Sequence, residues 1–157
     1  MKISKNAELA IREFVEECKK KFGENLTSIV MFGSHARGNF RESSDIDFLV
    51  IVKDLPEKWK ERKKLFEEAI RRISEKYEKY IEVIPLTEKE FISNLMHSNS
   101  LFITFFLGHK VLFDRNFFTP NFKNFAIALS KERYLYYEGG EKWEIKELAE
   151  KYLQNFG

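Results

Sequence analysis

Residues 32–48 read Phe-Gly-Ser-His-Ala-Arg-Gly-Asn-Phe-Arg-Glu-Ser-Ser-Asp-Ile-Asp-Phe and join two β-prone runs. The first run, residues 27–32, ends at Gly33, and the second continues as Phe-Leu-Val-Ile-Val to Val52. A short apolar run that is bounded by turn residues is typical of a buried strand. We therefore predict a strand, a polar loop and a second strand over residues 27–52.

The segments on either side of this unit alternate between helical and extended patterns. Apolar residues recur at helical spacing, and a Thr-x-x-Glu capping box at Thr87 marks a further helix start. We predict helices over residues 5–22, 56–77 and 88–107, strands over residues 80–86 and 110–113, and two C-terminal helices separated at Gly139 and Gly140. This order predicts an α+β (α/β mixed) fold, a small mixed sheet flanked by helices with a C-terminal helical extension.

Length and composition limit the classes of protein to which this chain can belong. A chain of 157 residues, of which 43% are hydrophobic, is long enough to form one domain with its own core. The formal net charge of +2 gives no strong nucleic-acid signal, and the single cysteine excludes an intrachain disulfide. No apolar run approaches the ~20 residues of a membrane span, so we expect a cytoplasmic protein without a membrane segment.

The loop after the first strand combines residue types that bind phosphate. Gly33 lets the backbone approach a ligand closely, and the N–H groups there can bind phosphate oxygens together with the Ser34 hydroxyl. Arg37, followed by Gly38, adds a guanidinium group that matches phosphate in charge and shape. A Gly-Ser pair alone can equally be an ordinary tight turn.

Two carboxylates follow at the start of the second strand. Asp45 and Asp47 are two residues apart, so both side chains leave the same face of the strand. Like charges side by side are unfavourable unless a cation lies between them, and hard oxygen ligands near phosphates suit Mg²⁺. An Asp-x-Asp pair alone can also cap a strand entry; the combination of both halves in this order predicts a two-metal phosphoryl-transfer site.

Glu82 is the candidate for a third carboxylate. It lies between Ile81 and Val83 in an apolar run, where a buried charge needs a partner. Glu82 could bind a second metal ion or accept the proton of an attacking hydroxyl. The alternative is that Glu82 simply points outward from an exposed edge strand.

The pattern Gly33-Ser34-x-Ala36-Arg37-Gly38 followed by Ser44-Asp45-x-Asp47 resembles the signature of the DNA polymerase β nucleotidyltransferase superfamily. More narrowly, it resembles the minimal nucleotidyltransferases, which are often paired with a HEPN-domain protein. The resemblance implies metal ligands at Asp45 and Asp47, with Glu82 at the place of a third carboxylate. It also implies nucleotide binding by the glycine–serine segment and its neighbours, Gly33, Ser34, Arg37, Gly38 and Ser44.

The resemblance implies a Mg²⁺-dependent enzyme that transfers a nucleoside monophosphate, AMP from ATP, to an acceptor hydroxyl. The acceptor suggested by analogy is a HEPN toxin, which would make this chain an antitoxin. A small-molecule acceptor of the aminoglycoside type, served by a homo-oligomer, and a catalytically inactive binding module are the alternatives. We predict a nucleotidyltransferase domain over residues 1–115 and a helical extension over residues 116–157.

Overall fold

The sheet is mixed and has four strands in the order β3-β2-β1-β4 in this computed structural model, which describes residues 3–131, 135–138 and 141–156. β1 pairs antiparallel with both β2 and β4, and β2 pairs parallel with β3. The predicted mixed sheet is thereby confirmed. The strands are β1 (Leu26–Phe32), β2 (Ile46–Val52), β3 (Ile81–Thr87) and β4 (Lys110–Asp114).

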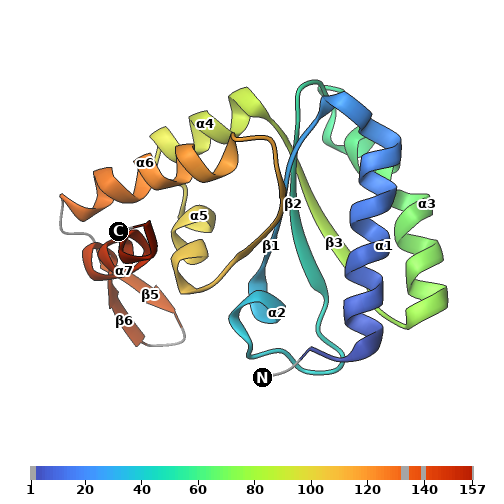
Figure 1. Cartoon of the computed structure of the whole chain (residues 1–157), viewed down its shortest axis with the longest axis horizontal. Coiled ribbons are helices and arrows are strands. Elements are labelled where there is room, and N and C mark those ends of the chain that lie inside the picture. Colours follow the sequence, from blue (N-terminus) through green and yellow to red (C-terminus); the bar gives the residue numbers. More distant parts are fainter. Residues whose placement is uncertain (1–2, 132–134, 139–140, 157) are drawn as a thin grey trace.

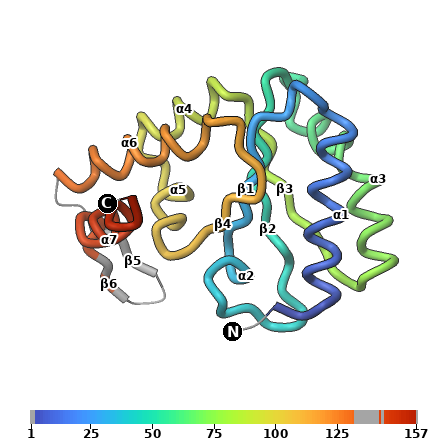
Figure 2. Tube along the Cα trace, viewed as in Figure 1, coloured from blue at the N-terminus to red at the C-terminus, as the bar shows by residue number. Residues whose placement is uncertain are grey.

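Helices cover both faces of this sheet (Figure 1). α1 (Lys5–Phe22) and α3 (Trp59–Tyr77) lie on one face of the sheet, and a second group of helices lies on the opposite face, as the trace in Figure 2 also shows. The second group contains α4 (Glu88–Met96), α5 (Ser100–Thr104), α6 (Phe118–Ser130) and α7 (Ile145–Leu153). No helix in the described ranges combines the length and the apolarity needed to cross a membrane.

β2 is one of the two inner strands, and its side chains contribute to two core clusters. Ile46, Phe48 and Val50 pack with α1 and α3, whereas Leu49 and Ile51 pack with the helices of the other face. This division follows from the strand period of two, which sends successive side chains to opposite faces. Asp47 shares its face with Leu49 and Ile51, so its carboxylate points away from α1 and α3.

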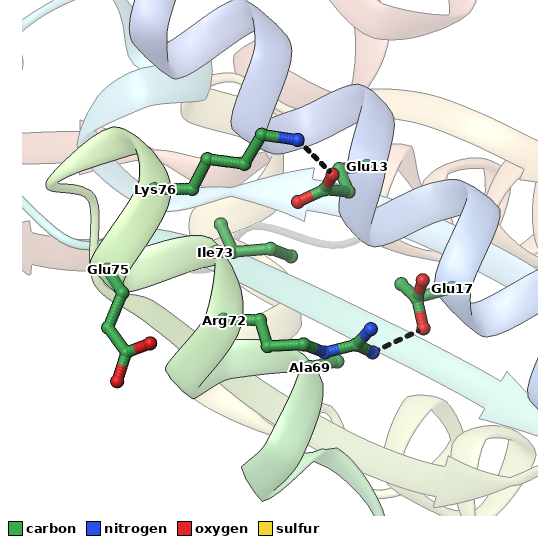
Figure 3. Close-up of a pocket in the computed structure, with 7 residues that line it drawn as sticks. All are labelled: Glu13, Glu17, Ala69, Arg72, Ile73, Glu75 and Lys76. Atoms are coloured by element: carbon green, nitrogen blue, oxygen red, sulfur yellow. Dashed lines mark hydrogen bonds and ion pairs between the residues drawn. The ribbon is translucent and has the colours of Figure 1, made fainter.

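Ion pairs join α1 to α3 along their exposed sides. Arg72 contacts Glu17 at 2.8 Å and Lys76 contacts Glu13 at 3.1 Å, which places two cross-helix pairs in a hollow of about 390 Å³ (Figure 3). Each carboxylate here has a cation as its neighbour. The carboxylates of this hollow, which follows the seam between α1 and α3, are thus paired within the chain.

The helix predicted over residues 88–107 is wrong in its length, because the structure breaks it after Met96. Ser98 adopts a left-handed backbone with φ 49°, and the Asn99 side chain accepts a hydrogen bond from Leu101 N at 2.9 Å to start α5. Asn and Ser favour turns and caps over helix interiors, and here that local preference prevails. A short 3₁₀ turn, Phe105–Leu107, then leads to Gly108.

Two helices, α6 and α7, do form in the C-terminal region, but the prediction that residues 135–138 and 141–144 belong to them is wrong. After α6, a pair of antiparallel strands, β5 (Leu135–Glu138) and β6 (Glu141–Glu144), precedes α7. The predicted break at Gly139 and Gly140 lies outside the described residues, between these two strands. A Gly-Gly pair between β-prone runs is a hairpin signal that the helical interpretation overlooked. The predicted division at residue 115 stays a prediction.

Candidate nucleotidyl-transfer site

The segment after β1 brings the two halves of the predicted site into contact, and residues 33–37, of which 34–37 were predicted as loop, form a short helix. Gly33 has a φ of 74°, and a Cβ atom built on it would overlap the carboxylate of Asp47. A glycine is therefore required there twice, for its backbone conformation and for the space beside the carboxylate. The predicted phosphate-binding glycine thus lies directly against a predicted metal ligand.

A single short helix, α2 (Gly33–Arg37), carries Ser34 and Arg37. Gly38 ends it in a left-handed conformation, with φ 78°, and donates its N–H to the Ser34 carbonyl. Gly108 packs closely against α2, because a Cβ built there would lie 3.1 Å from Arg37 Cα. The helix predicted over residues 88–107 stops just before Gly108, and the packing of this glycine against α2 depends on the fold.

Asp45 and Asp47 lie at the start of β2, as predicted, with the fully buried Ile46 between them. Burial raises the pKa of Asp47 to about 6, and the negative charges of Asp45 and Glu82 add to this effect. The positive charge of Arg37 opposes it. Asp47 is therefore a carboxylate crowded by like charge, an arrangement that a bound cation would relieve.

Glu82 lies opposite Asp47 in the parallel register of β2 and β3. Its side chain is 49% exposed and its Oε2 atom is 3.8 Å from Lys63 Nζ. Among the residues that the structure describes, no three acidic, histidine or cysteine side chains form a group that could hold a metal ion. Glu82 thus neighbours the aspartate pair, its carboxylate is oriented toward Lys63, and its role as third carboxylate stays a prediction.

The donor chemistry of the aspartate pair fits Mg²⁺. Two neighbouring carboxylates supply hard oxygen ligands, and burial, together with the negative charges of Asp45 and Glu82, raises the pKa of Asp47. Ser44 makes a local contribution: its Oγ accepts from Arg41 N at 2.8 Å, and its own N–H donates to the Arg41 carbonyl at 2.9 Å. Ser44 thereby shapes the turn before Asp45, and a contact with nucleotide stays a prediction.

His35 occupies the variable position of the signature, and sequence reasoning assigned it no role. In the structure its ring is buried, with an exposed fraction of 3%, and its Nδ1 lies 3.0 Å from the Asp45 carbonyl oxygen. The ring stacks on Phe40 with centroids 4.6 Å apart and an interplanar angle of 6°. No pattern of residue types in the sequence predicts this contact, because α2 and the start of β2 meet only in the folded structure.

Comparison with known proteins places this geometry in a family. Residues 11–112 match the family model described as a nucleotidyltransferase domain. A putative protein adenylyltransferase of Methanocaldococcus jannaschii (MJ1305) is 31% identical over 137 residues, which cover 87% of this chain and 92% of that protein. A second one from the same organism (MJ0141) is 37% identical over 82 residues, covering 52% and 79% respectively.

Similarity extends to a solved structure. The spectinomycin adenyltransferase AAD(9) of Enterococcus faecialis, solved with ATP and spectinomycin, superposes with a TM-score of 0.53 at 17% identity. The match covers 79% of this chain and 66% of that enzyme, and at this identity it shows a shared fold alone. The family match over residues 11–112 includes the glycine–serine segment, both aspartates and Glu82. This chain belongs to the nucleotidyltransferase domain family.

Proposed function

We propose that this nucleotidyltransferase transfers AMP from ATP to a hydroxyl group on a protein. The observation that carries the proposal is the contact between Gly33 and Asp47, which joins the phosphate-binding segment to the crowded carboxylates. In the reaction, the acceptor oxygen forms a bond to the α-phosphorus, the bond to the β-phosphate oxygen breaks, and pyrophosphate leaves. The acceptor hydroxyl loses its proton in the same step.

The residues of α2 and its entry would position the triphosphate. Gly33 leaves the backbone accessible beside Asp47, and Ser34 adds a hydroxyl in the first turn. Arg37 contributes a positive charge that already acts on Asp47 in the protein alone. Fixed donors and charges of this kind contribute most of the catalysis in phosphoryl chemistry, because they need no rearrangement during the reaction.

Asp45 and Asp47 would hold Mg²⁺, with Glu82 as a third ligand. The ion, when bound, neutralises charge on the phosphate oxygens and orients them. Glu82 contacts Lys63 across 3.8 Å, and this contact is exposed enough to be weak and to exchange. Once released from Lys63, Glu82 could take the proton of the acceptor hydroxyl, because it lies opposite Asp47 on the neighbouring strand.

A protein acceptor is favoured by the relative that matches most of this chain, which is named as a protein adenylyltransferase. The signature's resemblance to minimal nucleotidyltransferases makes a HEPN-domain protein the first partner to test, with this chain as its antitoxin. A partner of that kind would itself supply the acceptor hydroxyl to the site.

The experiment uses ATP labelled on its α-phosphate, Mg²⁺, and host-cell extract with or without an added HEPN protein. We expect label on a protein band with the wild type and none with Asp47→Asn, whereas Glu17→Gln, which changes a carboxylate in the α1–α3 hollow, retains the transfer. Label on a small molecule would redirect the proposal to a small-molecule acceptor. Binding of ATP and Mg²⁺ without any transfer would contradict catalysis and leave a binding module.

A further inference from the structure

We propose that His35 is a positioning residue, which fixes Asp45 relative to the phosphate-binding segment Gly33 and Ser34. This inference rests on the proposed function for its consequence in catalysis, but its structural part is independent of the acceptor. His35 belongs to α2, the helix that carries Ser34, and contacts the backbone at the start of β2. It is therefore a direct link between the two halves of the site.

The peptide group between Asp45 and Ile46 is held at both of its polar atoms. The Asp45 carbonyl lies 3.0 Å from His35 Nδ1, and the Ile46 N–H donates to the Tyr80 carbonyl at 3.0 Å. Since a peptide group is planar and rigid, two anchors on opposite sides determine its orientation. The Asp45 Cα is part of that plane, so the anchors also determine where the exposed Asp45 carboxylate begins.

The imidazole itself has little freedom to move. Its ring is stacked on Phe40 and buried under the loop, and α2 is confined between the Gly38 cap and the close approach of Gly108. Because the His35 ring is restrained in this way, its hydrogen bond fixes the position of the Asp45 carbonyl. Displacement of α2 by a ligand would therefore displace the Asp45 carbonyl with it.

The hydrogen-bonding state of His35 identifies the atom that matters. A carbonyl oxygen only accepts, so Nδ1 carries the proton in this contact. Nε2 is buried, and no group within the described residues hydrogen-bonds to it. Burial lowers the pKa of His35 and so keeps the ring neutral, in agreement with one protonated nitrogen. A phenylalanine would occupy the same space without an unpaired polar atom, so packing alone does not explain a histidine here.

A second hydrogen bond holds the loop between α2 and β2, farther from the site. Lys79, which is 7% exposed, donates from Nζ to the Glu42 carbonyl at 2.8 Å. This bond supports the loop but does not contact the Asp45–Ile46 peptide. Lys79→Met is therefore a matched variant that loosens the loop and leaves the His35 contact in place.

The test compares His35→Asn, His35→Gln and His35→Phe. Asparagine places its amide nitrogen at the same bond distance from the backbone as Nδ1, whereas glutamine places it one bond farther, where Nε2 would be. Phenylalanine keeps the stacking on Phe40 and loses the donor. The asparagine variant is thus the conservative replacement, and the other two remove the contact in different ways.

The first readout is Mn²⁺ binding in the presence of a non-hydrolysable ATP analogue, followed by electron paramagnetic resonance. We expect glutamine and phenylalanine to weaken Mn²⁺ binding and AMP transfer by roughly 10–100-fold, as for other residues that orient metal ligands. His35→Asn should stay within about threefold of wild type, and analogue binding in excess chelator should be the same in all variants. Hydrogen exchange at the Ile46 amide should quicken in the glutamine and phenylalanine variants only.

Two outcomes would overturn the inference. Mn²⁺ affinity equal to wild type in both His35→Gln and His35→Phe would show that the contact does not position Asp45. An asparagine variant as weak as the glutamine variant would show that the Nδ1 donor is not the relevant group. If phenylalanine prevents folding, the asparagine–glutamine pair still decides. If Mn²⁺ binding and exchange respond as expected but no protein is modified, the positioning role stands and the proposed function fails.

Discussion

Two groups of carboxylates in this molecule lie in opposite electrostatic surroundings. In the α1–α3 hollow, Glu13 and Glu17 each face a cation of α3 at 3.1 Å and 2.8 Å (Figure 3). At the start of β2, Asp47 faces Asp45 and Glu82, and its pKa is raised to about 6. Carboxylates that join two helices are paired within the chain, whereas those at the site are kept near other negative charges. The difference indicates a place where a ligand, not the fold, supplies the missing positive charge.

The largest expected effect is a difference in AMP transfer between a variant of the site carboxylates and a variant of the carboxylates in the α1–α3 hollow. Asp47→Asn should lower AMP transfer by at least roughly 10³-fold, because it removes a ligand from an ion that contributes several kcal/mol to the transition state. Glu17→Gln should retain the wild-type rate, since Glu17 lies in the α1–α3 hollow on the face opposite to Asp47. Single-turnover transfer of α-phosphate label measures both. Equal losses in the two variants would remove the distinction between the groups.

The next effect comes from the glycine beside Asp47. Gly33→Ala should lower transfer by roughly 10²-fold, because the new Cβ would displace the Asp47 carboxylate by a distance that such chemistry does not tolerate. Gly23 is the matched control: its φ is 52°, yet a Cβ there meets no atom within 4 Å. Gly23→Ala should cost roughly 1–3 kcal/mol of stability, because L-residues rarely adopt φ 52° with ψ −124°, and should leave the rate unchanged. A rate loss of similar size at Gly23 would attribute the effect to backbone strain alone.

A smaller effect concerns the stability of the metal-free protein. Folding raises the pKa of Asp47 from the ordinary aspartate value of 3.8 to about 6, so the folded state binds its proton more tightly. Stability should therefore fall as the pH rises from about 4 to about 6, and Asp47→Asn should escape this loss. With chelator above pH 6, the variant should be more stable by roughly 1 kcal/mol after allowance for solvent screening, or about 2–4 °C in Tm.

Thermal melts at several pH values measure this effect. The advantage of Asp47→Asn should vanish below about pH 4, where the carboxyl is protonated in both states. Added Mg²⁺ should stabilise the wild type more than the variant, because only the wild type retains both aspartates. A variant that is less stable than wild type at pH 7 in chelator would contradict the crowding of like charge at Asp47.

The smallest effect belongs to the helix seam. Glu17→Gln should lower the free energy of unfolding by less than about 1 kcal/mol, since its partner Arg72 is half exposed. Denaturant unfolding at low and high salt measures this change, which should shrink as salt screens the pair. A loss that is larger and independent of salt would mean that Glu17 is held more firmly than a surface ion pair.

Local patterns were sufficient for most of the sheet and for the site's residue types. The β-prone runs around residues 32–48 became β1 and β2. Asp47 is the second residue of β2 and Asp45 immediately precedes that strand, so their shared face stays a prediction. The prediction of one helix over residues 88–107 was wrong because Ser98 and Asn99 form a turn within a segment whose apolar residues otherwise recur at helical spacing. The helical prediction for the residues of β5 and β6 was wrong because the aromatic runs on either side of Gly139 and Gly140 suit strands as well as helices.

The sequence by itself determined that a glycine–serine pair follows one strand and an Asp-x-Asp pair opens the next, because both features depend on neighbours along the chain. Only the tertiary structure decided that Gly33 lies against Asp47, that Glu82 neighbours Asp47 yet pairs with Lys63, and that His35 holds the Asp45 carbonyl. Such contacts depend on strand register and on the angle at which α2 leaves β1. Both are set by packing across the whole sheet, which local residue patterns do not encode.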